Sequence, residues 1–249
     1  SGGGDSGSGI SNGSLPGDDY TDGEPITDND GNSYETVVIE GQTWTTTNLN
    51  VSTYRDGTPI PYISDFAEWQ NALTGAYTYA GQNIEAGYGK LYNAYAIIGK
   101  HDTDPNTINK ELAPEGFHIP TLSEWGILLS IYGGNTSDYS TVNTASDQAA
   151  YFLKSQISWT TSGNNESGLN IMKYPSISYG YQAGINFSEI TVFEVIYGSS
   201  TVVNGFSESL ILDGMKILES GMGRIDVTNR INNLYYTNAT GCYIRLLKD

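Results

Sequence analysis

The stretch from residue 112 to residue 132 constrains the fold more than any other part of the chain. Phe117 and Ile119 form a short apolar strand that stops at Pro120. Thr121 and Glu124 follow at the spacing of a capping box, which starts a helix. Apolar residues then recur at helical spacing, namely Trp125, Leu128, Leu129 and Tyr132. The stretch therefore predicts a strand, a proline stop and a capped helix with one buried face.

A β-hairpin is predicted near the start of the ordered chain, which we expect to begin at Ile26. Residues 34–39 and 42–45 flank Glu40 and Gly41, and a two-residue connection containing glycine is typical of hairpin turns. Residues 75–79 and 91–98 are rich in aromatic and aliphatic side chains. This composition favours strands or extended chain in the core.

Two further helices are predicted from caps and apolar spacing. Ser64 is the expected N-cap of a helix over residues 64–73, whose apolar face carries Phe66, Trp69 and Leu73. Thr144 is the expected N-cap of a helix over residues 144–156, and its buried residues are Ala149, Phe152 and Leu153. From Trp159 onward, short apolar runs alternate with glycine, serine and asparagine, so the second half is predicted to be strand and loop. Those runs are residues 190–195, 210–212 and 234–236.

The charge of the chain restricts its partners. Its 28 acidic residues outnumber 11 lysines and arginines, which leaves a net charge of −17. Phosphate backbones and anionic lipid headgroups are repelled by such a surface. We therefore expect no nucleic-acid partner, and contact with a membrane only through a lipid anchor.

Candidate catalytic groups are few. The one cysteine, Cys242, alternates with Ile244 and Leu246 on a terminal strand, a position typical of a buried apolar residue rather than a reactive thiolate. A cysteine–histidine dyad would need His101 or His118, the only histidines. We interpret His118 as a surface hydrogen-bonding residue. The sequence thus predicts no catalytic residue and no enzyme activity.

Calcium is the one cofactor that the pattern of carboxylates suggests. Asp102, Asp104 and Asn106 alternate as calcium ligands do, but the following glycine and the closing glutamate of a calcium loop are missing. The segment 28–32, with Asp28, Asp30 and Asn32, lacks them too. We interpret both segments as turns in which short polar side chains bond their own backbone, with calcium as the alternative. No cofactor and no metal site are predicted.

Residues 1–25 form a glycine, serine and aspartate segment with hardly any large apolar side chain. Such a segment cannot bury enough surface to offset its ordering entropy, so it is predicted to be a flexible tether. It resembles the start of a mature bacterial lipoprotein, whose lipid-bearing cysteine would stand just before Ser1. This resemblance implies an exported lipoprotein at the cell surface, on the outer membrane; the alternative is an ordinary disordered terminus or linker.

A series of short motifs follows along the rest of the chain: Asp30-Gly31-Asn32, Gly41-Gln42-Thr43-Trp44, Asp56-Gly57-Thr58-Pro59, Tyr88-Gly89-Lys90-Leu91-Tyr92-Asn93, Gly116-Phe117-His118-Ile119-Pro120-Thr121 and Tyr243-Ile244-Arg245. Their order over residues 26–249 resembles the Fibrobacter succinogenes major paralogous domain family. That family is similar to the formylglycine-generating-enzyme branch of the C-type-lectin-like fold. The resemblance implies a single α+β domain over residues 26–249, with two to three helices around small antiparallel sheets and a loop-rich second half.

Ligand-binding residues are not carried over from the family, because the second half of this chain departs from the family pattern at residues 172–176 and 192–197. Trp44, Trp69 and Trp125 fall in phase with apolar faces and are predicted to be core. Aromatic residues among glycine, serine and asparagine suit a sugar or protein surface, although each can instead pack down a loop. The candidate ligand-binding residues are Trp159, Tyr174, Tyr179, Tyr181, Tyr197, Tyr235 and Tyr236.

Three functions remain open at this point. The first is a non-enzymatic cell-surface binding or adhesion module, monomeric, that recognises a glycan or a surface protein through these loop aromatics. The second is a structural subunit or tip of a surface appendage, which requires an edge strand able to pair or a stable assembly. The third is a divergent enzyme with a cleft like that of the formylglycine-generating enzymes, which requires charged groups that converge in a pocket.

Overall fold

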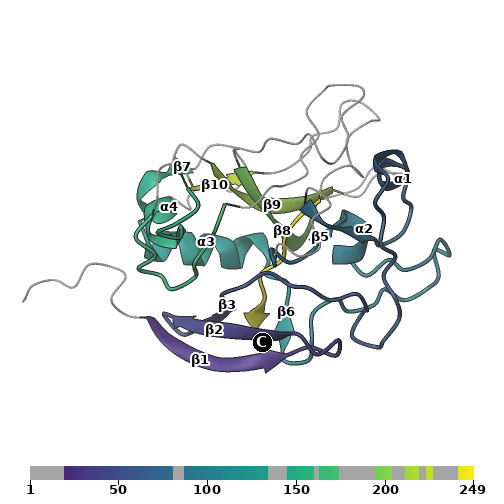
Figure 1. Cartoon of the computed structure of the whole chain (residues 1–249), viewed down its shortest axis with the longest axis horizontal. Helices are drawn as coiled ribbons and strands as arrows, with labels where there is room; N and C mark the ends of the chain where they lie inside the picture. Colours follow the sequence, from purple (N-terminus) through teal and green to yellow (C-terminus); the bar gives the residue numbers. More distant parts are fainter. Residues whose placement is uncertain are drawn as a thin grey trace, which may run out of the picture.

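The computed structural model describes residues 20–80, 87–133, 145–159, 163–173, 194–203, 211–218, 223–226 and 241–249. Within these ranges the architecture is α+β, as predicted, with short helices and small antiparallel sheets (Figure 1). None of the helices in the described ranges has both the length and the hydropathy of a membrane span.

A five-stranded antiparallel sheet joins the two ends of the described chain. Its strand order is β1-β2-β3-β11-β6, so the C-terminal strand β11 lies between β3 of the N-terminal hairpin and β6, which forms one edge of the sheet (Figure 1). The strands are β1 (Tyr20–Thr27), β2 (Ser33–Ile39), β3 (Gln42–Thr45), β6 (Phe117–His118) and β11 (Leu247–Lys248).

The predicted hairpin is confirmed as β2 and β3. Glu40 and Gly41 connect the strands with φ angles of 46° and 83°, the pair of positive values that a type I′ turn requires. The preceding strand, β1, begins at Tyr20, earlier than the predicted start of order at Ile26. It is mostly exposed and is ordered by backbone pairing with β2, which side-chain composition does not signal.

The central stretch folds as predicted. Strand β6 is followed by Thr121, whose hydroxyl accepts a hydrogen bond from the Glu124 backbone, while the Glu124 carboxylate accepts one from the Thr121 backbone. This capping box starts α3 (Leu122–Ile131). Trp125 packs against Trp44 of the sheet with 4.7 Å between ring centroids. The predicted apolar face is buried at Trp125, Leu128, Leu129 and Tyr132.

Helix α1 (Phe66–Gln70) differs from its prediction at both ends. Asp65, not Ser64, is the N-cap, because the Asp65 carboxylate accepts a hydrogen bond from the Glu68 backbone. The helix stops at Gln70, so Leu73 leaves the apolar face and is 58 % exposed. Trp69 is buried as predicted.

Helix α2 (Ala94–Ile97) lies where extended chain was predicted, and it makes four described helices where two to three were expected. Its N-cap is Asn93, whose side-chain oxygen accepts hydrogen bonds from the backbones of Ala96 and Ala76. The same side chain therefore starts the helix and fixes the neighbouring strand. The strand component of the prediction is confirmed by β4 (Tyr77–Thr78) and β5 (Leu91–Tyr92), which pair with each other.

Helix α4 (Asp147–Leu153) confirms the last predicted helix and buries Ala149, Phe152 and Leu153. Its predicted cap, Thr144, lies outside the described residues. Strand β7 (Ala145–Ser146) leads into the helix and belongs to a second sheet of order β7-β10-β9-β8. The other strands are β8 (Glu194–Val203), β9 (Ile211–Leu218) and β10 (Gly223–Asp226).

Helix α3 lies between the two sheets (Figure 1). Strands are present where apolar runs predicted them at residues 194–195 and 211–212, whereas residues 234–236 lie outside the described part of the chain. The C-terminal segment runs through the interior: Tyr243 and Leu247 pack in one apolar cluster, and Ile244 and Leu246 pack in another. Trp44, Trp69 and Trp125 are fully buried, which confirms their prediction as core.

Candidate functional site

Three tyrosines from two chain segments meet at the surface beside the short sheet of β4 and β5. Tyr62 forms an isolated parallel bridge with Tyr77, in which the Tyr77 backbone donates to Pro61 O over 2.9 Å. Tyr77 and Tyr79 are two residues apart along extended chain, so their side chains lie on one face. We call Tyr62, Tyr77 and Tyr79 the tyrosine cluster.

The rings of the tyrosine cluster support one another. The Tyr62 and Tyr77 rings stack with 5.6 Å between centroids and 28° between planes. The Tyr79 ring stands edge-on, 5.6 Å from Tyr62 and 5.8 Å from Tyr77. Partial burial raises the pKa of Tyr79, and the neighbouring Tyr77 and Tyr62 raise it further. These are the offset and edge-to-face arrangements that aromatic pairs prefer, so the cluster is held in one geometry.

The tyrosine cluster is partly exposed to solvent. Tyr62 is 42 % exposed, while Tyr77 and Tyr79 are half-buried. Among the described residues, none donates to or accepts from the three phenol hydroxyls. The cluster therefore offers a stacking surface together with hydroxyl groups that can donate and accept hydrogen bonds.

A buried lysine braces the cluster. Lys90 is 4 % exposed, and its ammonium donates to Asn50 O over 2.6 Å and to Ser52 Oγ over 2.8 Å. The same nitrogen lies 4.7 Å from the Tyr77 ring centroid and 5.9 Å from that of Tyr79. Burial lowers the pKa of Lys90, and the carboxylates of Asp30 and Asp28 oppose that shift. The ammonium thus fixes the rings through a cation–π contact in a largely dry setting.

Those two carboxylates belong to the turn that the sequence predicted at residues 28–32, and the turn is confirmed. The Asp28 carboxylate accepts from the Tyr34 hydroxyl over 2.5 Å and from the Asn32 backbone over 2.9 Å, and the Gly31 backbone donates to Asp28 O. Asp30 accepts from the Ser52 backbone and the Thr53 hydroxyl. The carboxylate oxygens of Asp28 and Asp30 are therefore bonded by protein N–H and O–H donors, and the nearby Lys90 ammonium supplies positive charge.

The second candidate calcium segment is also a turn, as predicted. The Asp104 backbone donates to the Asp102 carboxylate over 3.0 Å, and the Asn106 backbone donates to the Asp104 carboxylate over 2.9 Å. Such Asx turns are the local alternative to metal ligation. In the described ranges, no group of three or more histidine, cysteine or carboxylate side chains is placed so that it could hold a metal ion.

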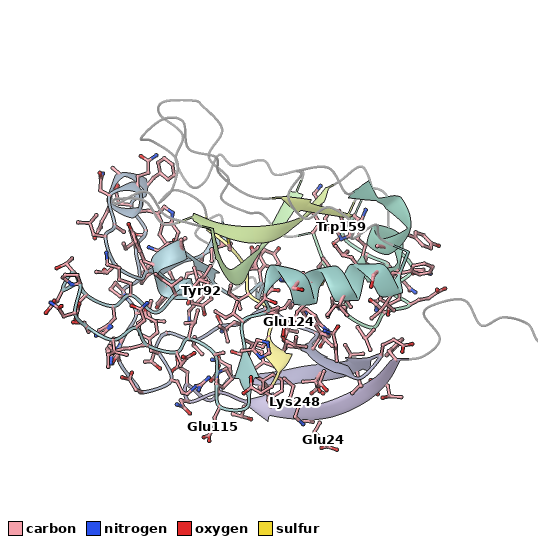
Figure 2. All side chains as sticks on the ribbon, turned by 180° about the vertical axis from the view of Figure 1, so that it is seen from behind. Glu24, Tyr92, Glu115, Glu124, Trp159 and Lys248 are labelled. Atoms are coloured by element: carbon pink, nitrogen blue, oxygen red, sulfur yellow. The ribbon has the colours of Figure 1, made fainter. Side chains whose placement is uncertain are left out.

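His118, in the edge strand β6 of the five-stranded sheet, lies between two carboxylates. Its Nδ1 is 2.8 Å from Asp249 Oδ1, and its Nε2 is 3.1 Å from Glu124 Oε1. Figure 2 shows Glu124 at the end of α3 nearest the C-terminal strand. Partial burial alone would raise the pKa of Glu124, but hydrogen bonds from Thr121 and the adjacent His118 lower it. Both ring nitrogens are engaged, so His118 ties α3 to the chain end.

Cys242 does not have the surroundings of a reactive thiol. Its backbone pairs with that of Tyr92 through hydrogen bonds of 2.9 and 3.0 Å. Although the residue is only partly buried as a whole, burial of the thiol raises its pKa to about 12. A thiol with such a pKa is almost fully protonated at neutral pH and is a poor nucleophile.

Of the aromatic residues predicted to bind a ligand, Trp159 and Tyr197 lie in the described part of the chain. Trp159 is 5 % exposed, its indole nitrogen donates to Ile171 O over 2.8 Å, and the Lys154 ammonium lies 4.4 Å from its ring. It packs beside α4, inside the molecule (Figure 2). Tyr197 lies in β8. The remaining candidates lie outside the described residues: Tyr174, Tyr179, Tyr181, Tyr235 and Tyr236.

The tyrosine cluster was not predicted from the sequence. The alternation of Tyr77 and Tyr79 was visible, but nothing in the sequence joined Tyr62 to them, because a single bridge between distant segments has no periodic signal. The role of Arg55 was not predicted either: its guanidinium donates to the carbonyls of Ala113, Pro114 and Phe117. Arg55 holds the turn that leads into β6.

Comparison with protein families matches residues 37–201 to the Fibrobacter succinogenes major domain. The matched part runs from β2 into β8 and includes the whole tyrosine cluster and Lys90. The family indicated by the order of motifs is thereby confirmed. Neither the search of curated proteins nor the search of solved structures found a match.

Proposed function

The chain belongs to the Fibrobacter succinogenes major domain family, and within it we propose that this protein is a non-enzymatic binding module that recognises a neutral glycan. The observation that carries this proposal is the braced, partly exposed cluster of Tyr62, Tyr77 and Tyr79. A sugar ring presents an apolar face of C–H groups and a rim of hydroxyls. Tyrosine meets both with its ring and its phenol group, and a fixed cluster loses little entropy on binding.

The size and charge of the surface favour a glycan over a protein partner. A stable protein interface buries about 800 Å² on each side around an apolar centre, whereas this cluster offers one well-exposed ring. One ring matches one sugar unit. The net charge of −17 disfavours polyanionic glycans, so we propose a neutral polysaccharide as the partner.

We further propose that residues 20–249, from β1 onward, form one C-type-lectin-like domain and that the protein is an exported, monomeric lipoprotein at the cell surface. The proposed location rests on the glycine, serine and aspartate composition of residues 1–19, before β1, which suits a tether. A tether of this composition would hold the module away from an anchor and let it search for an extended polysaccharide.

Two observations support glycan binding over the alternatives. His118 has both ring nitrogens engaged and Cys242 has a raised pKa, so neither favours the divergent enzyme. Strand β1, at the edge of its sheet, carries Asp22, Glu24 and Pro25 (Figure 2 labels Glu24). Charge and proline on an edge oppose the addition of a further strand, which disfavours a subunit assembled through that edge.

The test is a Tyr62→Ala variant of the full chain, assayed by affinity electrophoresis in gels that contain neutral polysaccharides. We expect retardation of the wild type by at least one polysaccharide and a roughly tenfold weaker interaction for the variant. The matched control is Tyr151→Ala, because Tyr151 is 50 % exposed on α4, outside the cluster. Equal retardation of both variants and the wild type would refute the assignment, and retention by a protein ligand alone would refute a glycan.

A further inference from the structure

The loop of residues 99–110 leaves the body of the protein and returns to it at one point. The Lys110 backbone donates to Gly99 O over 2.9 Å, and Gly99 has a φ of +78°. A Cβ on Gly99 would lie 1.7 Å from Lys110 O, so the two backbones touch there. The Lys110 ammonium also pairs with the Asp56 carboxylate. The loop is therefore a closed Ω-type loop fixed at its base.

The interior of the loop is also ordered by its own hydrogen bonds. Asx turns link Asp102 to Asp104 and Asp104 to Asn106, and the Thr107 backbone donates to Asp104 O over 3.1 Å. At the base, Lys100 O accepts from the Gly75 backbone over 2.7 Å. These bonds give the loop a preformed shape, which is the usual condition of a small-molecule site.

The loop encloses a half-open cavity of about 140 Å³, which we call the loop pocket. The polar residues that line it are Lys100, His101, Asp102, Asp104, Thr107 and Asn109. A cavity of about 150 Å³ accommodates a six-membered ring when its walls are apolar, so the loop pocket has the size of one such ring. Its walls are polar, so the ring must carry hydroxyl groups in place of bare C–H edges.

The lining carries charges of both signs. His101 Nε2 is 3.4 Å from Asp102 Oδ2. The Lys100 ammonium lies over the Tyr95 ring at 4.6 Å and has no carboxylate within 4.0 Å among the described residues. Asp104 uses Oδ1 for both bonds from Asn106, and its Oδ2 has no described partner. Acceptors and donors thus stand together, which suits neutral hydroxyls that both donate and accept.

We infer that the loop pocket binds one neutral pyranose residue of a glycan, with its hydroxyls donating to Asp104 and accepting from Lys100. This inference rests on the proposed glycan binding and adds a second contact to it. The tyrosine cluster stacks on the face of one sugar unit, and the loop pocket holds the edge of another.

The test is an amide NMR titration of the full chain with methyl glycosides of glucose, galactose and mannose. We expect at least one glycoside to shift the amides of residues 100–109, and about tenfold weaker binding in Asp104→Asn, which keeps an oxygen for the Asn106 bonds. Thr103→Ala is the matched control, because Thr103 is in the same loop but does not line the pocket. Unchanged amide signals outside residues 99–110 in the free spectrum show that each variant keeps the fold.

Each other outcome bears on one proposal. If no glycoside shifts the loop, or if Asp104→Asn binds as the wild type does, the inference is wrong, and Tyr62-dependent retention of polysaccharide then leaves the proposed function intact. Loop shifts with an α-amino acid and none with a glycoside would likewise overturn the pyranose assignment. Loop shifts with a glycoside, combined with retention that does not depend on Tyr62, would overturn the tyrosine cluster alone.

Discussion

Replacement of Lys90 with methionine perturbs the buried charge beneath the tyrosine cluster. Methionine keeps an unbranched apolar stem but removes the ammonium that donates to Asn50 O over 2.6 Å and to Ser52 Oγ over 2.8 Å. Lys90 is 4 % exposed, so water has little access to the acceptors that the substitution leaves behind. The change also removes the positive charge near Asp28 and Asp30.

The size of the effect follows from these contacts. A hydrogen bond to a charged group contributes about 1.5–3 kcal/mol, and removing one partner from a buried charged network costs about 3–5 kcal/mol. Burial of the ammonium is itself unfavourable and Asp30 is exposed, so the low end of that range applies. We expect the free energy of unfolding to fall by about 3 kcal/mol, which lowers Tm by about 6–12 °C in a chain of this length.

Urea denaturation and calorimetry of the full chain measure this loss. The matched control is Lys100→Met, because the Lys100 ammonium also lies over a tyrosine ring, 4.6 Å from its centroid, but makes no hydrogen bond to the described residues. That control should change the free energy of unfolding by about 1 kcal/mol or less. If Lys90→Met is as stable as the control, the ammonium does not brace the cluster.

Three further predictions concern stability. The pKa of Glu124 is lowered in the fold, so its charge stabilises the fold above the ordinary glutamate pKa of about 4.3. This contribution is lost as the pH falls through the lowered pKa. Glu124→Gln should therefore flatten the acid side of a curve of unfolding free energy against pH, measured by urea denaturation. Gly99→Ala should lower the free energy of unfolding by about 3 kcal/mol or more in urea denaturation, because the new Cβ would lie 1.7 Å from the backbone of Lys110. Gly116 has the same φ of +78° but open space around it, so Gly116→Ala should lower that free energy by only about 1 kcal/mol. Leu128→Ala should cost about 2–5 kcal/mol because Leu128 is fully buried, whereas its 49 % exposed neighbour Ile127 should tolerate alanine within about 1 kcal/mol.

The elements that the sequence predicted well are those with local signals. The capping box of Thr121 and Glu124 and the apolar period after it lie within one stretch, and each contact joins residues three or four apart. The hairpin turn at Glu40 and Gly41 is also local. Order in β1 was missed because it comes from backbone pairing with β2. Helix α2 was missed because one side chain, Asn93, both caps it and bonds a separate strand.

The candidate site depends on contacts that no local pattern contains. Tyr62 meets Tyr77 through one backbone bridge, and Lys90 approaches the rings from a third segment. Aromatic residues among glycine, serine and asparagine led to a predicted site in the second half of the chain, and one of them, Trp159, is buried. The loop pocket was considered only as a calcium loop, since spacing alone does not show that residues 99 and 110 touch.

The most direct test of glycan binding at the tyrosine cluster is NMR of the chain with ¹³C-labelled tyrosine rings, titrated with the neutral oligosaccharide that corresponds to a retained polysaccharide. We expect the ring signals of Tyr62, Tyr77 and Tyr79 to shift together with a single dissociation constant, and the signal of Tyr151 on α4 to stay in place. Saturable shifts confined to other tyrosines, with the cluster unchanged, would contradict the assignment of the site.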